Sequence, residues 1–338
     1  MNTRARRLDR KLGHIAGGRY EPDDFVLADA KDADMAFGVT SAGPVSVLPD
    51  VPDATVGAGI YRTREAYLAS MRSLVGHGVL DVLLTSASNG ERLAAGGALD
   101  EDDVTLAVRA NDSSDIWLAR GSSYGGLPSR PFRTVDLAAI APFCDLVLYS
   151  VTFNNDLEHD LATLEAYRAF RLEAAEVGIR HFLEVFNPNA PVGLEPAQIA
   201  PFVNDSIVRT LAGVTDSQRP LFLKVAYNGA DALAELVEHD RSLVVGILGG
   251  AAGTTRDTFE LLQRVHSLGA RVALFGRKIK QAESQLELVR LMPRVLRGEL
   301  SPEGAVRAYH ETLTEAGVTP MRALAADLAI TDPVLVSE

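Results

Sequence analysis

The stretch Leu221-Phe-Leu-Lys-Val225, with Leu243-Val-Val-Gly-Ile-Leu248 and Arg271-Val-Ala-Leu-Phe275 after it, decides the fold. Each of these short apolar runs precedes a longer stretch with apolar residues every three or four positions, which is the spacing of an amphipathic helix. The runs themselves are nearly continuous rather than alternately polar and apolar. Continuous runs are typical of parallel strands that are covered on both faces. The second half of the chain therefore predicts repeated strand–helix units.

The same alternation extends toward the N-terminus. Five further strand-like runs are Phe25–Asp29, Leu80–Leu84, Val104–Arg109, Asp145–Val151 and His181–Phe186. Helical patterns lie near 64–76, 158–177, 196–212, 230–239, 255–268 and 282–297. Eight strands with intervening helices predict an α/β protein, a (β/α)₈ TIM barrel that uses residues 1–338 as a single domain. We expect an extra helix before strand one, over 3–16, and further helices at the C-terminus; a doubly wound sheet is the alternative.

Charge and cysteine content narrow the class of protein. The 338 residues carry 33 Lys and Arg against 45 Asp and Glu, a net charge of −12. A balance this acidic argues against unspecific binding to nucleic acid or to an anionic membrane surface. The one cysteine, Cys144, makes an internal disulfide impossible and favours a reducing compartment. With no apolar run near the roughly 18 residues of a membrane span, we expect a cytoplasmic protein.

Lys224 is the first candidate for chemistry, because it stands near the C-terminal end of predicted strand six. Burial disfavours an ammonium ion and lowers its pKa. A neutral lysine amine is a nucleophile that condenses with a ketone or aldehyde to form a Schiff base. The structural alternative is a lysine whose stem is buried while its head reaches water. Position alone leaves both interpretations open.

Two glycine turns follow predicted strands seven and eight. Gly249-Gly250 precedes a helix that Thr254 is expected to cap, and Gly276-Arg277 opens the next helix. In TIM barrels, phosphate commonly binds between these two loops, where glycine lets backbone amides approach the anion. Arg277 would add a bidentate partner. Either turn alone would suit a tight strand-to-helix connection, but both turns beside Lys224 predict a phosphate site.

The segment Leu221–Gln281 resembles the class I, Schiff-base aldolases of the DhnA/FbaB type and their relatives, the tagatose-bisphosphate and sulfofructose-phosphate aldolases. Those enzymes are (β/α)₈ barrels with a Lys-Val or Lys-Thr segment on strand six, a Gly-Gly turn after strand seven and a Gly-Arg-x-Ile turn after strand eight. The resemblance implies that Lys224 is the Schiff-base residue. It also implies that a substrate phosphate is held by Gly249, Gly250, Gly276 and Arg277.

Candidates for proton transfer come from three other strands. Asp29 ends strand one, where similar aldolases have an Asp that contacts substrate hydroxyls or assists proton transfer; a polar strand-end or capping residue is its structural alternative. Glu184 lies within strand five and matches a Glu of the tagatose-bisphosphate branch; a salt bridge inside the barrel is its structural alternative. Strand four lacks the lysine or tyrosine of those relatives at the places of Leu148 and Thr152. Tyr149 is close to them, either as a proton-transfer group or as an outward-facing core residue.

Two further cations are possible substrate contacts. Arg109 ends strand three and can meet a carboxylate or phosphate, although an ion pair between strand ends explains it equally well. Lys31 either pairs with Asp29 or helps to keep Lys224 neutral.

Together these residues predict a lyase, a class I aldolase that makes or breaks a C–C bond in a phosphorylated sugar. The ketose phosphate would yield dihydroxyacetone phosphate and an aldehyde through a lysine Schiff base. Such chemistry needs no metal and no organic cofactor, and the histidines show no zinc-site spacing. Schiff-base acyl transfer on a phosphorylated keto compound and a non-catalytic phosphosugar-binding barrel are the alternatives. We expect a small-molecule partner and a homo-oligomer.

Overall fold

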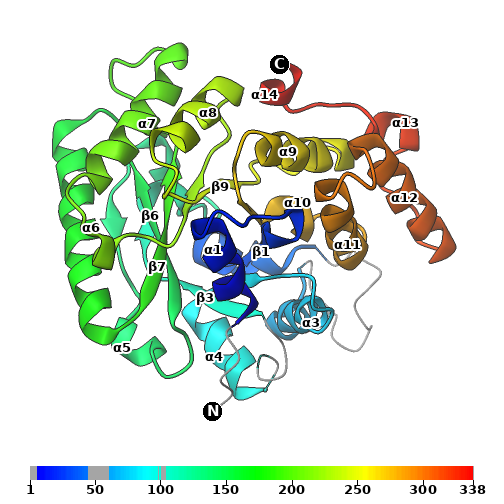
Figure 1. The fold of residues 1–338 in the computed structure, drawn as a ribbon. Helices are drawn as coiled ribbons and strands as arrows, with labels where there is room; N and C mark the ends of the chain where they lie inside the picture. Colours follow the sequence, from blue (N-terminus) through cyan, green and yellow to red (C-terminus); the bar gives the residue numbers. More distant parts are fainter. Residues whose placement is uncertain (1–5, 45–60, 98, 100–103, 338) are drawn as a thin grey trace.

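A closed parallel barrel forms the centre of the molecule (Figure 1). The structure is a computed structural model that describes residues 6–44, 61–97, 99 and 104–337. Around the barrel the strand order is β1-β10-β9-β8-β7-β6-β3-β2, and every neighbouring pair is parallel. The strands are β1 Val26–Lys31, β2 Val82–Thr85, β3 Thr105–Arg109, β6 Leu146–Thr152, β7 Arg180–Phe186, β8 Leu223–Val225, β9 Val245–Leu248 and β10 Val272–Phe275. The predicted TIM barrel is confirmed, and closure of the sheet excludes the doubly wound alternative.

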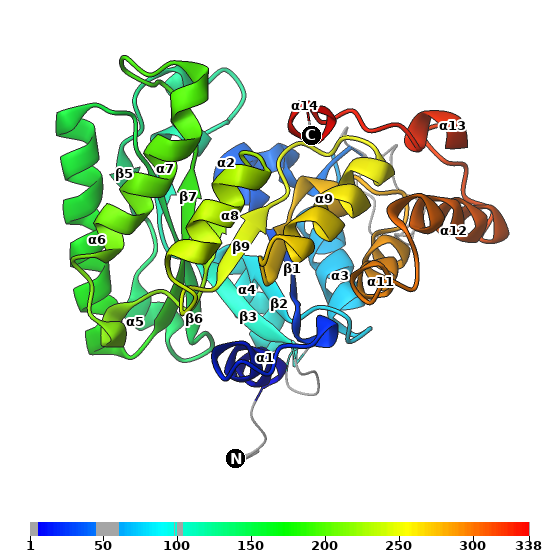
Figure 2. The ribbon, with the colours of Figure 1, turned by 45° about the horizontal axis from the view of Figure 1, so that its top comes forward.

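Helices cover the outside of the barrel (Figures 1 and 2). The longer ones are α1 Arg7–Ala16, α3 Arg64–Val75, α4 Ala87–Ala95, α6 Leu157–Val177, α7 Pro196–Leu211, α8 Ala230–His239, α9 Thr255–Ser267, α11 Gln285–Leu296 and α12 Pro302–Glu315. Short helices are α2 Ala33–Phe37, α5 Leu137–Ile140, α10 Arg277–Lys280, α13 Leu324–Asp327 and α14 Pro333–Val336. A small hairpin of β4 Asp112–Ser113 and β5 Pro131–Phe132 follows β3. Each predicted helical stretch contains one of these helices, with ends that differ by a few residues.

The two faces of each strand meet different surroundings. One set of alternate side chains fills the barrel lumen and includes Ala28, Leu148, Phe182 and Phe222. The other set packs outward against the helices in a separate, larger cluster. Because successive side chains in a strand point to opposite faces, odd or even position along each strand decides whether a residue reaches the lumen. Whether each candidate residue described below faces the lumen or the helices therefore follows from its position along its strand.

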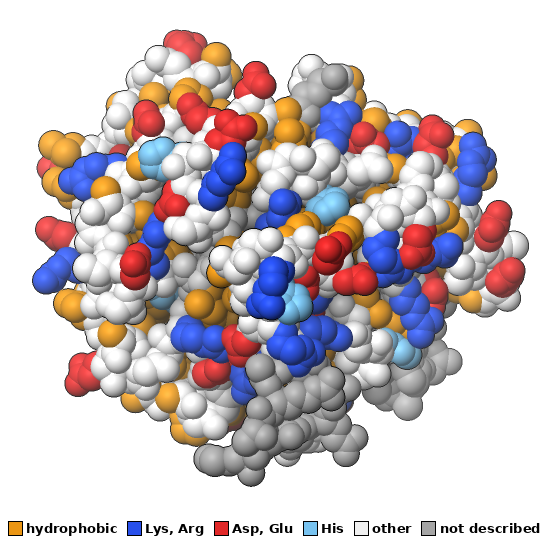
Figure 3. Space-filling model, viewed as in Figure 1, with side chains coloured by type: hydrophobic (Ala, Val, Ile, Leu, Met, Phe, Trp, Pro, Cys, Tyr) orange, Lys and Arg blue, Asp and Glu red, His pale blue; other side chains and the backbone are white. Residues whose placement is uncertain are grey.

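Helix α1 closes the N-terminal end of the barrel, below β1, β2 and β3 in Figure 2. Its Leu8 is fully buried in the lumen cluster. Charged residues on either side of Leu8 hold the helix as well: Arg7 and Lys11 pair with the buried Asp81 carboxylate at 2.8 and 2.9 Å. Figure 3 shows charged side chains of both signs intermixed on the face that carries α1. The helix predicted before strand one is therefore a plug with an apolar inner side.

The C-terminal segment is fastened to the start of α9. The Asp327 carboxylate accepts a hydrogen bond from the backbone amide of Thr255 at 2.8 Å and pairs with His310 at 2.9 Å. The Asp257 carboxylate, in turn, accepts from the amide and hydroxyl of Thr331 at 2.7 and 2.6 Å. These contacts fix the chain after α12 across the helix that follows β9.

Candidate active site

Lys224 lies in the lumen at the C-terminal end of β8 and is 5% exposed. Its amine pairs with the Glu184 carboxylate. The contact follows from strand register, since Ser150, Glu184, Lys224 and Gly246 are successive partners across β6, β7, β8 and β9. A Cβ on Gly246 would lie 2.6 Å from Val272 Cβ, so glycine is required where β9 approaches β10. The paired residues across these four strands therefore place the buried Lys224 amine beside the buried Glu184 carboxylate.

Arg109 connects this pair to two other polar groups. From the end of β3, its guanidinium donates to Glu184 at 3.0 Å and to the Ser150 hydroxyl at 2.6 Å. Ser150 in turn donates to Glu184 at 2.7 Å. Burial alone would raise the pKa of the Glu184 carboxyl, but the Lys224 and Arg109 cations outweigh it and hold that pKa below its usual range. Glu184 is therefore a carboxylate whose two oxygens are both occupied.

Asp32 completes the cluster, and sequence reasoning missed it. Its carboxylate accepts from Arg109 Nε at 2.5 Å, and it is 9% exposed. Burial opposes ionisation here as well, yet the charges of Arg109 and then Lys224 keep the pKa of Asp32 lowered. The sequence did contain a signal for Asp32. It directly follows β1, and polar residues that directly follow the strands of a TIM barrel lie at the C-terminal end of the barrel, where active sites are found.

The Asp32–Arg109 ion pair predicts a specific pH dependence. Since its pKa is lowered in the folded protein, ionised Asp32 adds stability above its unfolded pKa of about 3.9, and that stability is lost as the pH falls through the folded value. We expect the difference in free energy of unfolding between wild type and Asp32→Asn to be largest near pH 7 and to shrink below about pH 4. Urea titrations at several pH values measure it; a difference that stays constant down to about pH 3 would contradict the pairing.

Asp29 and Lys31 lie on the outer side of β1, away from Lys224, and pair with each other, which was one of the two interpretations of Lys31. Ala28 and Ala30 face the lumen, so the parity of the strand turns Asp29 and Lys31 outward. Both side chains are fully buried there, paired at 3.1 Å, and the Lys31 amine also donates to Gln285 of α11 at 2.7 Å. Burial raises the pKa of Asp29, with Lys31 opposing. The structure does not bring this pair to the lumen, and we do not include it in the site.

Tyr149 also faces outward, as the core residue that was its alternative interpretation. Val147 and Val151 of the same strand share this face, while Leu148 and Ser150 face the lumen. The Tyr149 ring packs on Phe170 of α6, with ring centroids 4.3 Å apart. Burial raises the pKa of the Tyr149 hydroxyl. A proton-transfer role at Lys224 is therefore corrected to a packing role against α6.

The two glycine turns lie side by side at the C-terminal ends of β9 and β10. Gly249 and Gly250 follow β9, Gly276 follows β10, and Leu248 pairs with Leu274 just before them. Gly250 has a φ of +63°, which side chains rarely adopt, so this turn is built for glycine.

The N-terminus of α9, by contrast, is already bonded by the protein itself. The amide of Thr254 donates to Asp257, and the amide of Thr255 donates to Asp327, each at 2.8 Å. The Asp257 and Asp327 carboxylates thus occupy the helix N-terminus at which the sequence predicted part of a phosphate site. A phosphate near Lys224 would therefore rely on the glycine turns and not on the first amides of α9.

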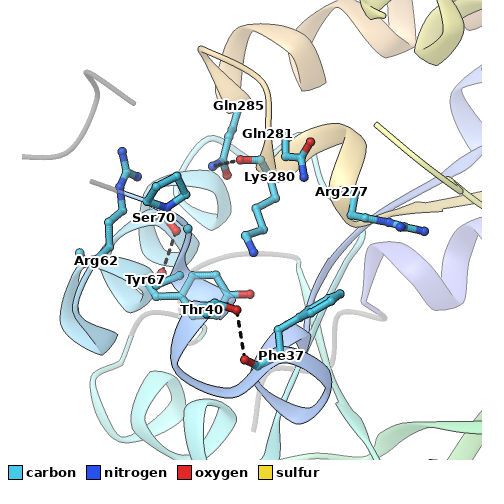
Figure 4. Close-up of a pocket in the computed structure, with 13 residues that line it drawn as sticks. Phe37, Thr40, Arg62, Tyr67, Ser70, Arg277, Lys280, Gln281 and Gln285 are labelled. Atoms are coloured by element: carbon cyan, nitrogen blue, oxygen red, sulfur yellow. Dashed lines mark hydrogen bonds between the residues drawn. The ribbon is translucent and has the colours of Figure 1, made fainter. Parts of the chain in front are cut away.

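Arg277, the remaining predicted phosphate ligand, is exposed at the start of α10. It lines a pocket with Lys280, but its guanidinium points away from the Lys280 amine (Figure 4). The structure thus brings Lys224, Glu184 and Arg109 together in the lumen and leaves Arg277 at the mouth.

Comparison with solved structures gives the same barrel. An archaeal fructose 1,6-bisphosphate aldolase is similar with a TM-score of 0.59 and 14% identity, over 86% of this chain and 99% of that one. A Schiff-base-forming fructose-1,6-bisphosphate aldolase follows with a TM-score of 0.58 and 15% identity, over 86% and 99% of the two chains. The fold is that of Schiff-base aldolases. The fructose-bisphosphate aldolase of Slackia heliotrinireducens has a TM-score of 0.62 and 15% identity, covering 91% of each chain.

Two comparisons by sequence gave no match. No family model matches the chain, and no curated protein matches it. Within the described residues, no group of three or more His, Cys, Asp or Glu side chains is placed to hold a metal ion. No helix in that part of the chain has the length and apolar character needed to cross a membrane.

Proposed function

We propose that this protein is a class I aldolase that cleaves or forms a C–C bond in a phosphorylated sugar through a Schiff base on Lys224. The observation that carries the proposal is the contact between the Lys224 amine and the Glu184 carboxylate inside the lumen. An ammonium ion is not a nucleophile, so a base must take its proton before it attacks a carbonyl. Glu184 is already in contact with that proton.

The reaction follows from this arrangement. After Glu184 accepts a proton, the Lys224 amine attacks the ketone carbon and forms a carbinolamine. Glu184 then returns the proton to the carbinolamine hydroxyl, which leaves as water, so that an iminium ion forms and Glu184 is again a carboxylate. The iminium withdraws electrons, so the C3–C4 bond breaks when the C4 hydroxyl gives up its proton, which leaves an enamine and an aldehyde. Glu184 or Asp32 accepts that proton, since both are carboxylates held ionised around Arg109. Proton return to the enamine and hydrolysis release the ketone and restore Lys224.

The remaining groups position the substrate. We assign the substrate phosphate to the turns at Gly249, Gly250 and Gly276, with Arg277 at the mouth as the cation that swings onto it. Holding the phosphate at the ends of β9 and β10 places the ketone beside β8. With the ketone held in this orientation, attack by the Lys224 amine no longer requires a chance encounter between two freely moving molecules.

Borohydride trapping tests the proposal. The protein is incubated with dihydroxyacetone phosphate, reduced with borohydride, digested and examined by peptide mass spectrometry. We expect a stable mass gain on Lys224, absent without borohydride and absent from Lys224→Met. A panel of phosphosugars, with and without added aldehydes, then identifies the partner aldehyde. If Lys224 stays unmodified throughout while phosphosugars still bind, the barrel is a binding protein and the aldolase proposal is wrong.

A further inference from the structure

A second polar site lies outside the barrel lumen (Figure 4). It is a pocket of about 230 Å³ between the chain after β1, helix α3 and helix α10. Three basic residues line it, Arg62, Arg277 and Lys280, together with Tyr67 of α3. Because Tyr67 belongs to the outer hydrophobic cluster, the pocket is on the outer side of β1, whereas Lys224 is on the lumen side.

The described residues that line this pocket carry positive charge and no negative charge. No Asp or Glu is among the described residues that line it. The Lys280 amine is directed into the cavity and makes no ion pair or hydrogen bond with the residues described (Figure 4). Burial, and then the ammonium of Lys31, lower the pKa of Lys280 to about 8. A cation in this position would be stabilised by an anion from outside the chain.

Tyr67 supplies an unused donor at the same place. Its side chain is 4% exposed, and its hydroxyl, which lies near the backbone of Ala33, has no acceptor for its own proton in the described structure. Figure 4 shows the Tyr67 ring and the Lys280 amine facing the same space. A buried hydroxyl without an acceptor costs free energy, so an acceptor in the pocket would satisfy it.

Three carboxylates lie near Tyr67, those of Asp34, Asp32 and Asp29. Asp29 pairs with Lys31 at 3.1 Å, and Asp32 pairs with Arg109 at 2.5 Å. One oxygen of Asp34 accepts from the Ser86 hydroxyl and from the Asn89 side-chain amide at 2.6 and 3.0 Å. None of the three carboxylates lines the pocket.

We propose that this pocket binds phosphate, either inorganic phosphate or the phosphoryl group of a small ester, with Lys280 as its cation and the Tyr67 hydroxyl as a second donor. At roughly 30 Å³ for each water-sized group, 230 Å³ holds about seven non-hydrogen atoms, enough for a phosphate and a short stem. The site is separate from Lys224 and does not depend on the aldolase proposal. It would let a phosphate compound bind on the outer side of β1, in a pocket that Arg277 also lines.

Chemical labelling of the lysine amines tests the proposed phosphate site in the wild-type protein. Acetic anhydride is applied at pH 8 with inorganic phosphate, with glycerol 3-phosphate, or with potassium chloride at the same ionic strength, and each lysine is followed by mass spectrometry. We expect phosphate to slow acetylation of Lys280 at least about tenfold, because a paired ammonium is not a nucleophile. Lys278 is the matched control: its pKa is also lowered to about 8 by burial, but its amine donates to Ala252 at 3.3 Å and does not line this pocket.

The results distinguish inorganic phosphate from a phosphate ester as the ligand of the pocket. Protection of Lys280 by both compounds supports a site for inorganic phosphate, and protection by glycerol 3-phosphate alone supports a site for an ester. Tyr67→Phe should weaken the protection about tenfold, whereas Ser70→Ala should not, because Ser70 already donates to the Tyr67 carbonyl at 2.7 Å. Equal protection of Lys280 and Lys278, equal protection by chloride, or no protection would each overturn the proposal. Trapping at Lys224 is measured separately and is unaffected by any of these results.

Discussion

Lys224→Met is expected to lower aldol turnover by roughly 10⁴-fold or more, while the protein stays folded. Methionine has a similar length and suits a side chain that is 5% exposed. It cannot form an iminium, so the step that makes the C3–C4 bond breakable is lost. The measurement is kcat/KM for cleavage of the ketose phosphate that the trapping experiment identifies.

A control distinguishes lost chemistry from lost structure. In Lys224→Met, Glu184 keeps its hydrogen bonds from Arg109 and Ser150, at 3.0 and 2.7 Å, so the carboxylate stays partnered. We therefore expect unchanged binding of a phosphosugar that cannot react and a circular dichroism spectrum like that of wild type. Turnover within tenfold of wild type would show that Lys224 is a structural lysine.

Arg109→Leu is expected to destabilise the fold by about 3–5 kcal/mol, the usual cost of removing one partner from a buried ion pair. Arg109 is 5% exposed, and its guanidinium contacts Asp32, Ser150 and Glu184. Glu184 keeps Lys224 as a cation, but Asp32 loses the guanidinium that keeps it ionised. The free energy of unfolding from urea titration at pH 7 measures the effect.

Arg109→Lys provides the matched comparison. It retains the positive charge but not the planar fork that reaches two carboxylates at once, so it should recover only part of the lost stability. Both variants should also slow the proposed reaction, because Glu184 and Asp32 would no longer be held in place. An Arg109→Leu protein with the urea midpoint of wild type would mean that the network adds nothing to the stability of the barrel.

The barrel itself could be predicted from the sequence because its signals are local. Short apolar runs, amphipathic stretches between them and caps such as Thr63 and Thr254 each depend on residues close together in the chain. The same holds for Lys224 and for the glycine turns, whose places at strand ends follow from counting strands. Glu184 was also placed correctly beside the lumen, with both its proton-transfer and its ion-pair interpretations still open.

The parity of each strand could not be predicted in this way. Parallel barrel strands are buried on both faces, so their sequences lack the alternation that would show which side chains point inward. The sequence therefore left open whether Asp29 and Tyr149 reach the lumen, and the structure turns both toward the helices. Asp32, only three positions from Asp29, is the carboxylate that meets Arg109.

The sequence by itself determined the strand–helix repeat, the net negative charge and the presence of a lysine at the end of a barrel strand. Only the tertiary structure decided what surrounds that lysine. Arg109, Ser150, Glu184 and Lys224 are far apart in the chain and meet because β3, β6, β7 and β8 are neighbours in register. The physical reason is that a buried charge must find its partner across strands, and the partner depends on barrel closure and strand parity rather than on nearby sequence.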